Sequence, residues 1–170
     1  MPKNKYGFTI VELLIVIVVI AILATISVVA YNGIQNRTND SIIQQDLANF
    51  AKKAELYKID NDHYPTPGSL DALGFKATRS AYDLGYYNLY YCVNPSGSQY
   101  SLAGKSKSAI RYYITSEGRG NIGAGSMSWA NLCNGTAPPT TLNTTHNGGN
   151  DVGTTGYNPS SLTWSTWVGQ

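Results

Sequence analysis

The sequence predicts an α+β protein in which one long N-terminal helix, made of a transmembrane half and an amphipathic half, packs on a small antiparallel sheet. Three observations predict this fold: an uncharged apolar run near the N-terminus, an amphipathic stripe that follows it, and aromatic-rich segments in the second half of the chain. A length of 170 residues leaves room for one domain beside the membrane segment.

The apolar run is long enough to cross a membrane. No residue from Leu13 to Ala30 is charged, and only Thr25 and Ser27 are polar. About 20 apolar residues, at about 1.5 Å each, span the hydrocarbon core of a bilayer, which is roughly 30 Å thick. A secretory signal has a shorter apolar core followed by a small-residue cleavage site, so this run is expected to remain in the mature protein.

Charged residues stand on the N-terminal side of the run. Lys3 and Lys5 precede it, and the positive-inside rule places them in the cytoplasm, so the rest of the chain is expected to be exported. The carboxylate of Glu12 lies at the front of the run, where a lone acid is costly to bury. A plain N-terminal anchor is the alternative, although an anchor gains nothing from such an acid.

The helical pattern continues beyond the apolar run. Apolar residues recur there at intervals of three or four, which predicts an amphipathic stripe. The stripe consists of Ile43, Leu47, Phe50, Ala54 and Tyr57. No proline interrupts residues 8–64, so one helix of about 80 Å is expected from residue 8 to about residue 60. Pro65 and Pro67 cannot continue a helix.

Strand signals dominate the second half of the chain. The segments 86–93, 99–103 and 109–115 are expected to form an antiparallel meander against the exported half of the helix. Residues 69–75 are expected to form one short helical turn before them.

Residues 135–170 are rich in threonine, asparagine and glycine, which predicts a loop or mobile tail that ends, at most, in a strand over 161–168. In a regular strand Trp164 and Trp167 would face opposite sides, so one ring would pack and the other would be exposed. An exposed ring could bind a sugar or a surface partner, and packing at the sheet edge is the alternative.

No catalytic constellation stands out. Residues 118–123 spell the dinucleotide-binding pattern, but no periodic helix follows and no acid occurs before Asp151, so they are interpreted as a flexible turn. Residues 104–106 match the end of a phosphate-binding loop, but the first glycine of that loop is missing from the required position before them. Twelve basic and ten acidic residues create no basic field for nucleic acid. The sequence therefore predicts neither an enzyme nor a cofactor.

A lysine-containing leader, Gly7, Phe8 and Glu12 precede the apolar run in that order. With this order of residues the N-terminus resembles that of type IV pilins and type II secretion pseudopilins. The resemblance implies that a prepilin peptidase cuts between Gly7 and Phe8 and methylates the new N-terminal Phe8. Loss of the leader removes two of the twelve basic residues, so the mature chain has ten basic and ten acidic residues and no net charge.

The resemblance also divides the chain into five parts. They are the leader (1–7), a hydrophobic transmembrane and assembly helix (8–34), the amphipathic half of the helix (35–64), a sheet domain with a disulfide (65–134) and the loop or tail (135–170).

The two cysteines and the exported topology suggest one disulfide, between Cys92 and Cys133, and not a metal site. Pilins commonly carry one disulfide in this region, and the chain-entropy model values such a bridge at about 4 kcal/mol. Two free thiols are the alternative.

Some pseudopilins bind calcium in their sheet region, but this sequence offers no pattern for a calcium loop. Asp60 and Asp62 recur at the right interval, yet Tyr64 and Pro65 stand where an acid or amide and a glycine are required.

By resemblance, the chain is a structural pilin that polymerises through its N-terminal helix into a surface filament for adhesion, motility or DNA uptake. Its partners are copies of itself, other pilins, the prepilin peptidase, the assembly platform and, before assembly, membrane lipid. It is first a single-pass protein of the cytoplasmic membrane, with a cytoplasmic N-terminus, and then part of an extracellular filament. Glu12 is expected to pair with the amine of Phe8 in an adjoining subunit; the alternative is that it pairs only with its own N-terminus or lies in the headgroup region of the membrane. The alternatives are a type II secretion pseudopilin and a membrane-tethered adhesive module.

Overall fold

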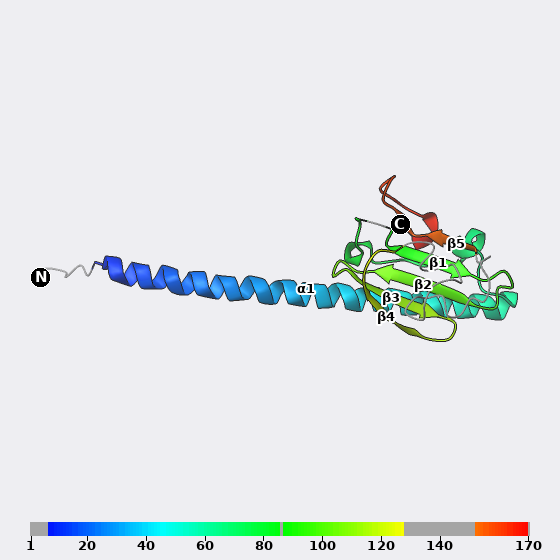
Figure 1. The fold of residues 1–170 in the computed structure, drawn as a ribbon, viewed down its shortest axis with the longest axis horizontal. Coiled ribbons are helices and arrows are strands. Elements are labelled where there is room, and N and C mark those ends of the chain that lie inside the picture. The colour runs from blue at the N-terminus through cyan, green and yellow to red at the C-terminus, as the bar shows by residue number, and fades with distance from the viewer. Residues whose placement is uncertain (1–6, 86, 128–151, 170) are drawn as a thin grey trace, which may run out of the picture. The chain divides into compact units, whose positions relative to one another are not determined.

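The computed structural model describes residues 7–85, 87–127 and 152–169. The chain divides into two compact units, residues 1–35 and 36–170 (Figure 1). The first unit holds the beginning of helix α1 (Ile10–Asn61), and the second holds the rest of α1 with a five-stranded antiparallel sheet. The predicted α+β architecture is confirmed.

Helix α1 runs without a break over 52 residues, as the absence of proline predicts. It ends before Pro65 is reached, because Asp62 turns the chain into the left-handed conformation with a φ of 64°. The backbone N–H of Asp62 donates to the carbonyl of Lys58 at 2.8 Å. Aspartate tolerates this conformation better than most residues, so it can replace the usual C-terminal glycine.

In the first unit α1 exposes apolar side chains all round. Every large apolar side chain from residue 8 to residue 34 is at least 48% exposed. The Thr25 hydroxyl donates to the carbonyl of Ala21 at 2.9 Å, and the Ser27 hydroxyl donates to that of Leu23 at 2.8 Å. Such internal partners are what polar groups need in hydrocarbon. Among the residues that the structure describes, α1 is the one helix that is long and apolar enough to cross a membrane.

The sheet of the second unit has the strand order β4-β3-β2-β1-β5, with antiparallel neighbours throughout. Its strands are β1 (Leu89–Val93), β2 (Tyr100–Lys105), β3 (Ile110–Thr115), β4 (Arg119–Ala124) and β5 (Val152–Thr155). Strands β1, β2 and β3 confirm the predicted meander. The predicted helical turn is a 3₁₀ helix over Pro67–Leu73, and a second 3₁₀ helix covers Arg79–Ala81.

Strand β4 corrects the prediction of a flexible turn over residues 118–123. Glycine weakens a strand in isolation, but pairing with β3 holds residues 119–124 in a strand. A Cβ at Gly120 would stand 2.9 Å from the hydroxyl oxygen of Tyr113. Glycine at this position therefore allows the tyrosine ring to lie close against the edge strand.

The described C-terminal residues differ from the predicted loop or tail. Strand β5 pairs with β1 inside the main sheet. Strands β6 (Tyr157–Asn158) and β7 (Thr163–Trp164) form a second, two-stranded sheet. The terminal strand predicted over 161–168 is limited to β7, because a 3₁₀ helix follows over Thr166–Val168.

This change of direction brings both C-terminal tryptophans onto the core. The ring of Trp167 lies 6.1 Å from that of Phe50, and the ring of Trp164 lies 5.6 Å from that of Tyr82, measured between centroids. The two rings therefore do not face opposite sides of a strand. Packing, and not an exposed binding surface, accounts for them.

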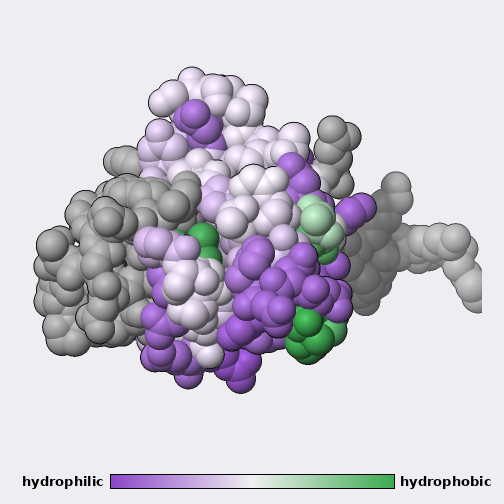
Figure 2. Space-filling model, turned by 90° about the vertical axis from the view of Figure 1, so that its right-hand side faces the viewer, coloured by the Kyte–Doolittle hydropathy of each residue, from purple (hydrophilic) through white to green (hydrophobic). Residues whose placement is uncertain are grey.

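The core of the second unit lies between α1 and one face of the sheet. Ile43, Leu47, Phe50 and Ala54 of the stripe are buried there, and Tyr57 is partly buried. The surface of this unit seen in Figure 2 is mostly hydrophilic or neutral, with only small apolar areas.

One buried carboxylate joins α1 to the segment before β1. Asp46 is 4% exposed and accepts three hydrogen bonds, from the Thr78 backbone N–H at 2.6 Å and from the hydroxyls of Thr78 and Tyr82 at 3.2 Å each. Burial raises the pKa of Asp46, and the three hydrogen bonds offset this effect only in part.

We expect Asp46→Ala to lower the free energy of unfolding by about 2–4 kcal/mol, because it leaves buried donors without an acceptor. Tyr82→Phe is the matched control, since it removes one of the three bonds and should cost about 1 kcal/mol. Chemical denaturation followed by tryptophan fluorescence measures both. A loss below about 0.5 kcal/mol for Asp46→Ala, the size of an ordinary surface change, would contradict this role.

Three buried tyrosines predict a steep loss of stability in alkali. Burial raises the pKa of Tyr82, Tyr91 and Tyr100 well above the usual 10.0. Above pH 10 the unfolded chain loses these protons while the folded chain keeps them, so the free energy of unfolding falls as the pH rises. Each group contributes about 1.4 kcal/mol per pH unit, or about 4 kcal/mol for the three.

Denaturation at pH 9, 10 and 11 tests this dependence, and Tyr91→Phe should reduce the alkaline slope by at most about 1.4 kcal/mol per pH unit. A flat profile between pH 10 and 11 would contradict it.

Candidate functional site

A reciprocal hydrogen-bonded cap closes the N-terminus of α1. Oε2 of Glu12 accepts from the backbone N–H of Thr9 at 2.8 Å and from its hydroxyl at 2.7 Å. The backbone N–H of Glu12 donates to Oγ1 of Thr9 at 3.2 Å. This is a capping box, and it provides partners for backbone N–H groups near the helix start that would otherwise lack them. Glu12 therefore has a structural role within its own subunit, and its pairing with Phe8 of an adjoining subunit stays a prediction.

Sequence reasoning considered only the charge of Glu12 and missed this cap. Thr9 is followed three residues later by Glu12, directly before an apolar run, which is the sequence pattern of a capping box. The pattern was sufficient to find it.

The predicted cleavage site lies next to the cap but outside the helix. Gly7 and Phe8 precede the first helical residue, Ile10, and both are exposed. A Cβ at Gly7 would meet no atom within 4 Å, so this fold does not require glycine at that position. A requirement for glycine would come from a protein that binds this segment.

Of the two predicted disulfide cysteines, the structure describes one. Cys92 lies in β1, is 1% exposed, and packs with Tyr90, Ala103 and Met127 in a cluster separate from the core against α1. Cys133 lies outside the described residues, so the bridge stays a prediction.

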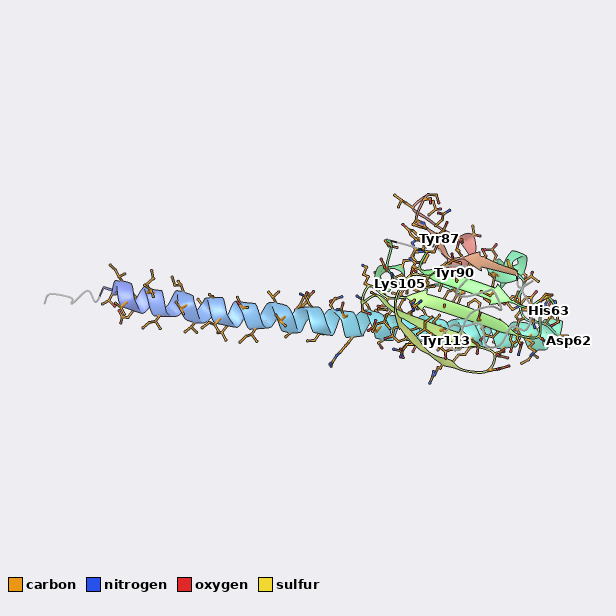
Figure 3. The ribbon with its side chains drawn as sticks, in the orientation of Figure 1. Asp62, His63, Tyr87, Tyr90, Lys105 and Tyr113 are labelled. Atoms are coloured by element: carbon orange, nitrogen blue, oxygen red, sulfur yellow. The ribbon has the colours of Figure 1, made fainter. Side chains whose placement is uncertain are left out.

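Other titratable side chains are dispersed over the second unit. Figure 3 shows Asp62 and His63 at one end of it, away from Lys105 and Tyr87. Lys105 forms an ion pair with Asp83 at 2.8 Å. Within residues 7–85, 87–127 and 152–169, no group of three or more His, Cys, Asp and Glu residues could hold a metal ion.

Two family models match the chain. The model of the prokaryotic N-terminal methylation motif matches residues 2–28, and that of the type II secretion system protein G matches residues 31–135. The first therefore covers the leader, Gly7, Phe8 and Glu12, and the second covers α1 beyond the apolar run together with β1 to β4.

Curated relatives carry both kinds of name. The chain is 40% identical to the type IV wide pilus major component PilA4 of Thermus thermophilus, over 45% of this chain and 59% of that protein. It is 34% identical to the type II secretion system core protein G of Aeromonas hydrophila, over 49% of this chain and 63% of that protein. For core protein G of Klebsiella pneumoniae the identity is 30%, over 59% of this chain and 75% of that protein. The chain thus spans about three fifths of the first two relatives.

Proposed function

Because the chain belongs to the type II secretion system protein G family, we propose that it is a structural subunit of a type IV pilus-like surface filament. It enters the membrane as a precursor and polymerises with copies of itself and with other pilins through the N-terminal part of α1. Its place is the cytoplasmic membrane before assembly and an extracellular filament after it. No catalytic activity belongs to this function.

The uncovered apolar helix of the first unit carries this proposal. Its large apolar side chains are all substantially exposed, and an apolar surface of this kind needs lipid or other helices around it. Lipid covers the helix before assembly, and helices of neighbouring subunits replace the lipid in a filament.

Processing prepares the subunit for assembly. The exposed Gly7–Phe8 bond before the helix is accessible to a prepilin peptidase, which cuts it and methylates the amine of Phe8. An assembly platform in the membrane then adds the subunit to the filament.

A type II secretion pseudopilin is the second candidate, because the model that covers most of this chain is that of protein G. Mass spectrometry of filaments sheared from the cell surface separates the two. Recovery of the chain as an abundant component supports the pilus subunit, and its absence from sheared material, with the mature chain still in the membrane, supports the pseudopilin.

The Cys92–Cys133 bridge belongs to the same exported domain. Cys133→Ser should lower the free energy of unfolding by about 2–5 kcal/mol, as is usual when a small exported domain loses its disulfide, and should leave membrane insertion unchanged. Denaturation with and without reducing agent measures the loss. Alkylation of two free thiols in protein from the cell surface would contradict the bridge.

A further inference from the structure

A bulge interrupts the pairing of β3 with β4. The register shifts between Ile110 and Tyr112, so that two residues of β4, Ile122 and Gly123, stand opposite Arg111. A bulge of this kind takes backbone groups out of the ladder, and those groups need other partners.

The guanidinium of Arg111 supplies these partners. Its Nε donates to the carbonyl of Gly123 at 3.2 Å, and Nη1 donates to that of Ser126 at 3.0 Å. Its Nη2 donates to the carbonyls of Ile122 at 2.9 Å and Ala124 at 3.2 Å. Four of the five N–H groups of a guanidinium are used in this way.

Two glycines shape the segment around the guanidinium. Gly123 has a φ of 71°, which favours glycine. A Cβ at Gly125 would stand 2.9 Å from both Cζ and Nη2 of Arg111, so any other residue there would displace the guanidinium. The two glycines therefore allow the backbone to approach the guanidinium closely.

Converging carbonyl oxygens are also ligands for calcium, which some pseudopilins bind in their sheet region. The donor set of the segment Ile122–Ser126 does not fit calcium. Four carbonyls are already bonded to a permanent cation, and the sequence has no aspartate or glutamate between Glu117 and Asp151. Calcium sites rely on carboxylates to balance the charge of the ion.

We infer that the guanidinium of Arg111 takes the place of a metal ion at this edge of the sheet and fixes the segment Ile122–Ser126 without calcium. The guanidinium is covalently part of the chain, so a chelator cannot remove this cation. The carbonyls that it engages are also withheld from any strand of a neighbouring subunit, which protects the edge against unwanted pairing. The inference does not depend on which filament the chain builds.

Hydrogen exchange of the full chain in detergent, read by mass spectrometry, tests this inference. Arg111→Met should raise the exchange of amides in residues 122–126 at least about tenfold, a ratio that corresponds to about 1.4 kcal/mol. Arg111→Lys should raise it as well, because an ammonium lacks the planar fork that reaches four carbonyls. Arg119→Met is the matched control, since Arg119 is exposed on β4, and it should leave this exchange unchanged.

Calcium provides the second arm of the experiment. Neither EGTA nor added calcium chloride should change the unfolding midpoint of the wild type or the exchange of residues 122–126. A midpoint that falls with EGTA and recovers with calcium would overturn the inference. So would an Arg111→Met protein whose exchange equals that of the wild type. Filament assembly is not measured in either arm, so a failure here is distinct from a failure of the proposed function.

Discussion

Gly7→Val will leave the subunit in the membrane as a precursor that keeps its leader, residues 1–7. The valine side chain should not disturb the fold of the subunit, because a Cβ at Gly7 meets no atom within 4 Å and the helix begins only at Ile10. The effect falls on the peptidase, which must fit the residue before the scissile bond. A steric clash of a few kcal/mol slows cleavage at least about a hundredfold, at about 1.4 kcal/mol for each factor of ten.

Intact-mass measurement of the membrane fraction distinguishes the precursor from the methylated mature chain. Gly33→Ala is the control, because a Cβ at Gly33 also meets nothing within 4 Å but lies inside α1. This control should be cleaved like the wild type and should favour the helix by about 1 kcal/mol. A wild-type N-terminus other than Phe8, or normal cleavage of Gly7→Val, would contradict the processing step.

The elements that the sequence predicts well are those with a local pattern. Helix α1 has an apolar run and then a stripe of period 3.6, and both patterns can be read within a few turns. Strands β1, β2 and β3 follow one another with short turns and carry aromatic residues, so propensity and order along the chain agree. The order of Gly7, Phe8 and Glu12 before the apolar run can likewise be recognised within a few residues of sequence.

The elements that it misses depend on distant partners. Strand β4 contains two glycines that no propensity assigns to a strand, and its conformation is set by pairing with β3. Strand β5 joins β1 from far along the chain, so no local signal announces it. The contact between Arg111 and four carbonyls requires the bulge register, which only the folded sheet provides.

Glu12→Gln will be exported, cleaved and folded but will be absent from filaments. The carboxylate has two separate tasks, the cap with Thr9 inside the subunit and the proposed charge pair with the amine of Phe8 in an adjoining subunit. Glutamine can still serve in a capping box, so the substitution keeps the first task and removes the second. Burying an acid at the edge of an apolar bundle costs a few kcal/mol unless a cation compensates.

The charge pair also sets the register of assembly. Cleavage after Gly7 creates the amine of Phe8 close to the start of the helix that Glu12 caps. Both bonds from Thr9 are accepted by Oε2, and among the described residues no hydrogen bond goes to Oε1 of Glu12, which leaves that oxygen open to a second donor. A subunit out of register would bury the carboxylate and the amine apart, so mismatched contacts are penalised as well as matched ones favoured.

Three variants separate the cap from the charge. Glu12→Gln removes the charge, Thr9→Val removes the hydroxyl of the cap and keeps the carboxylate, and Glu12→Ala removes both. For the two Glu12 variants we expect the amount of sheared filament to fall to background. Each 1.4 kcal/mol of lost pairing free energy corresponds to a loss of about tenfold in assembled subunit. Thr9→Val should still assemble. Assembly of Glu12→Gln with failure of Thr9→Val would show that the cap matters and the charge does not. Wild-type filament levels in all three would show that neither the cap nor the charge of Glu12 is needed for assembly.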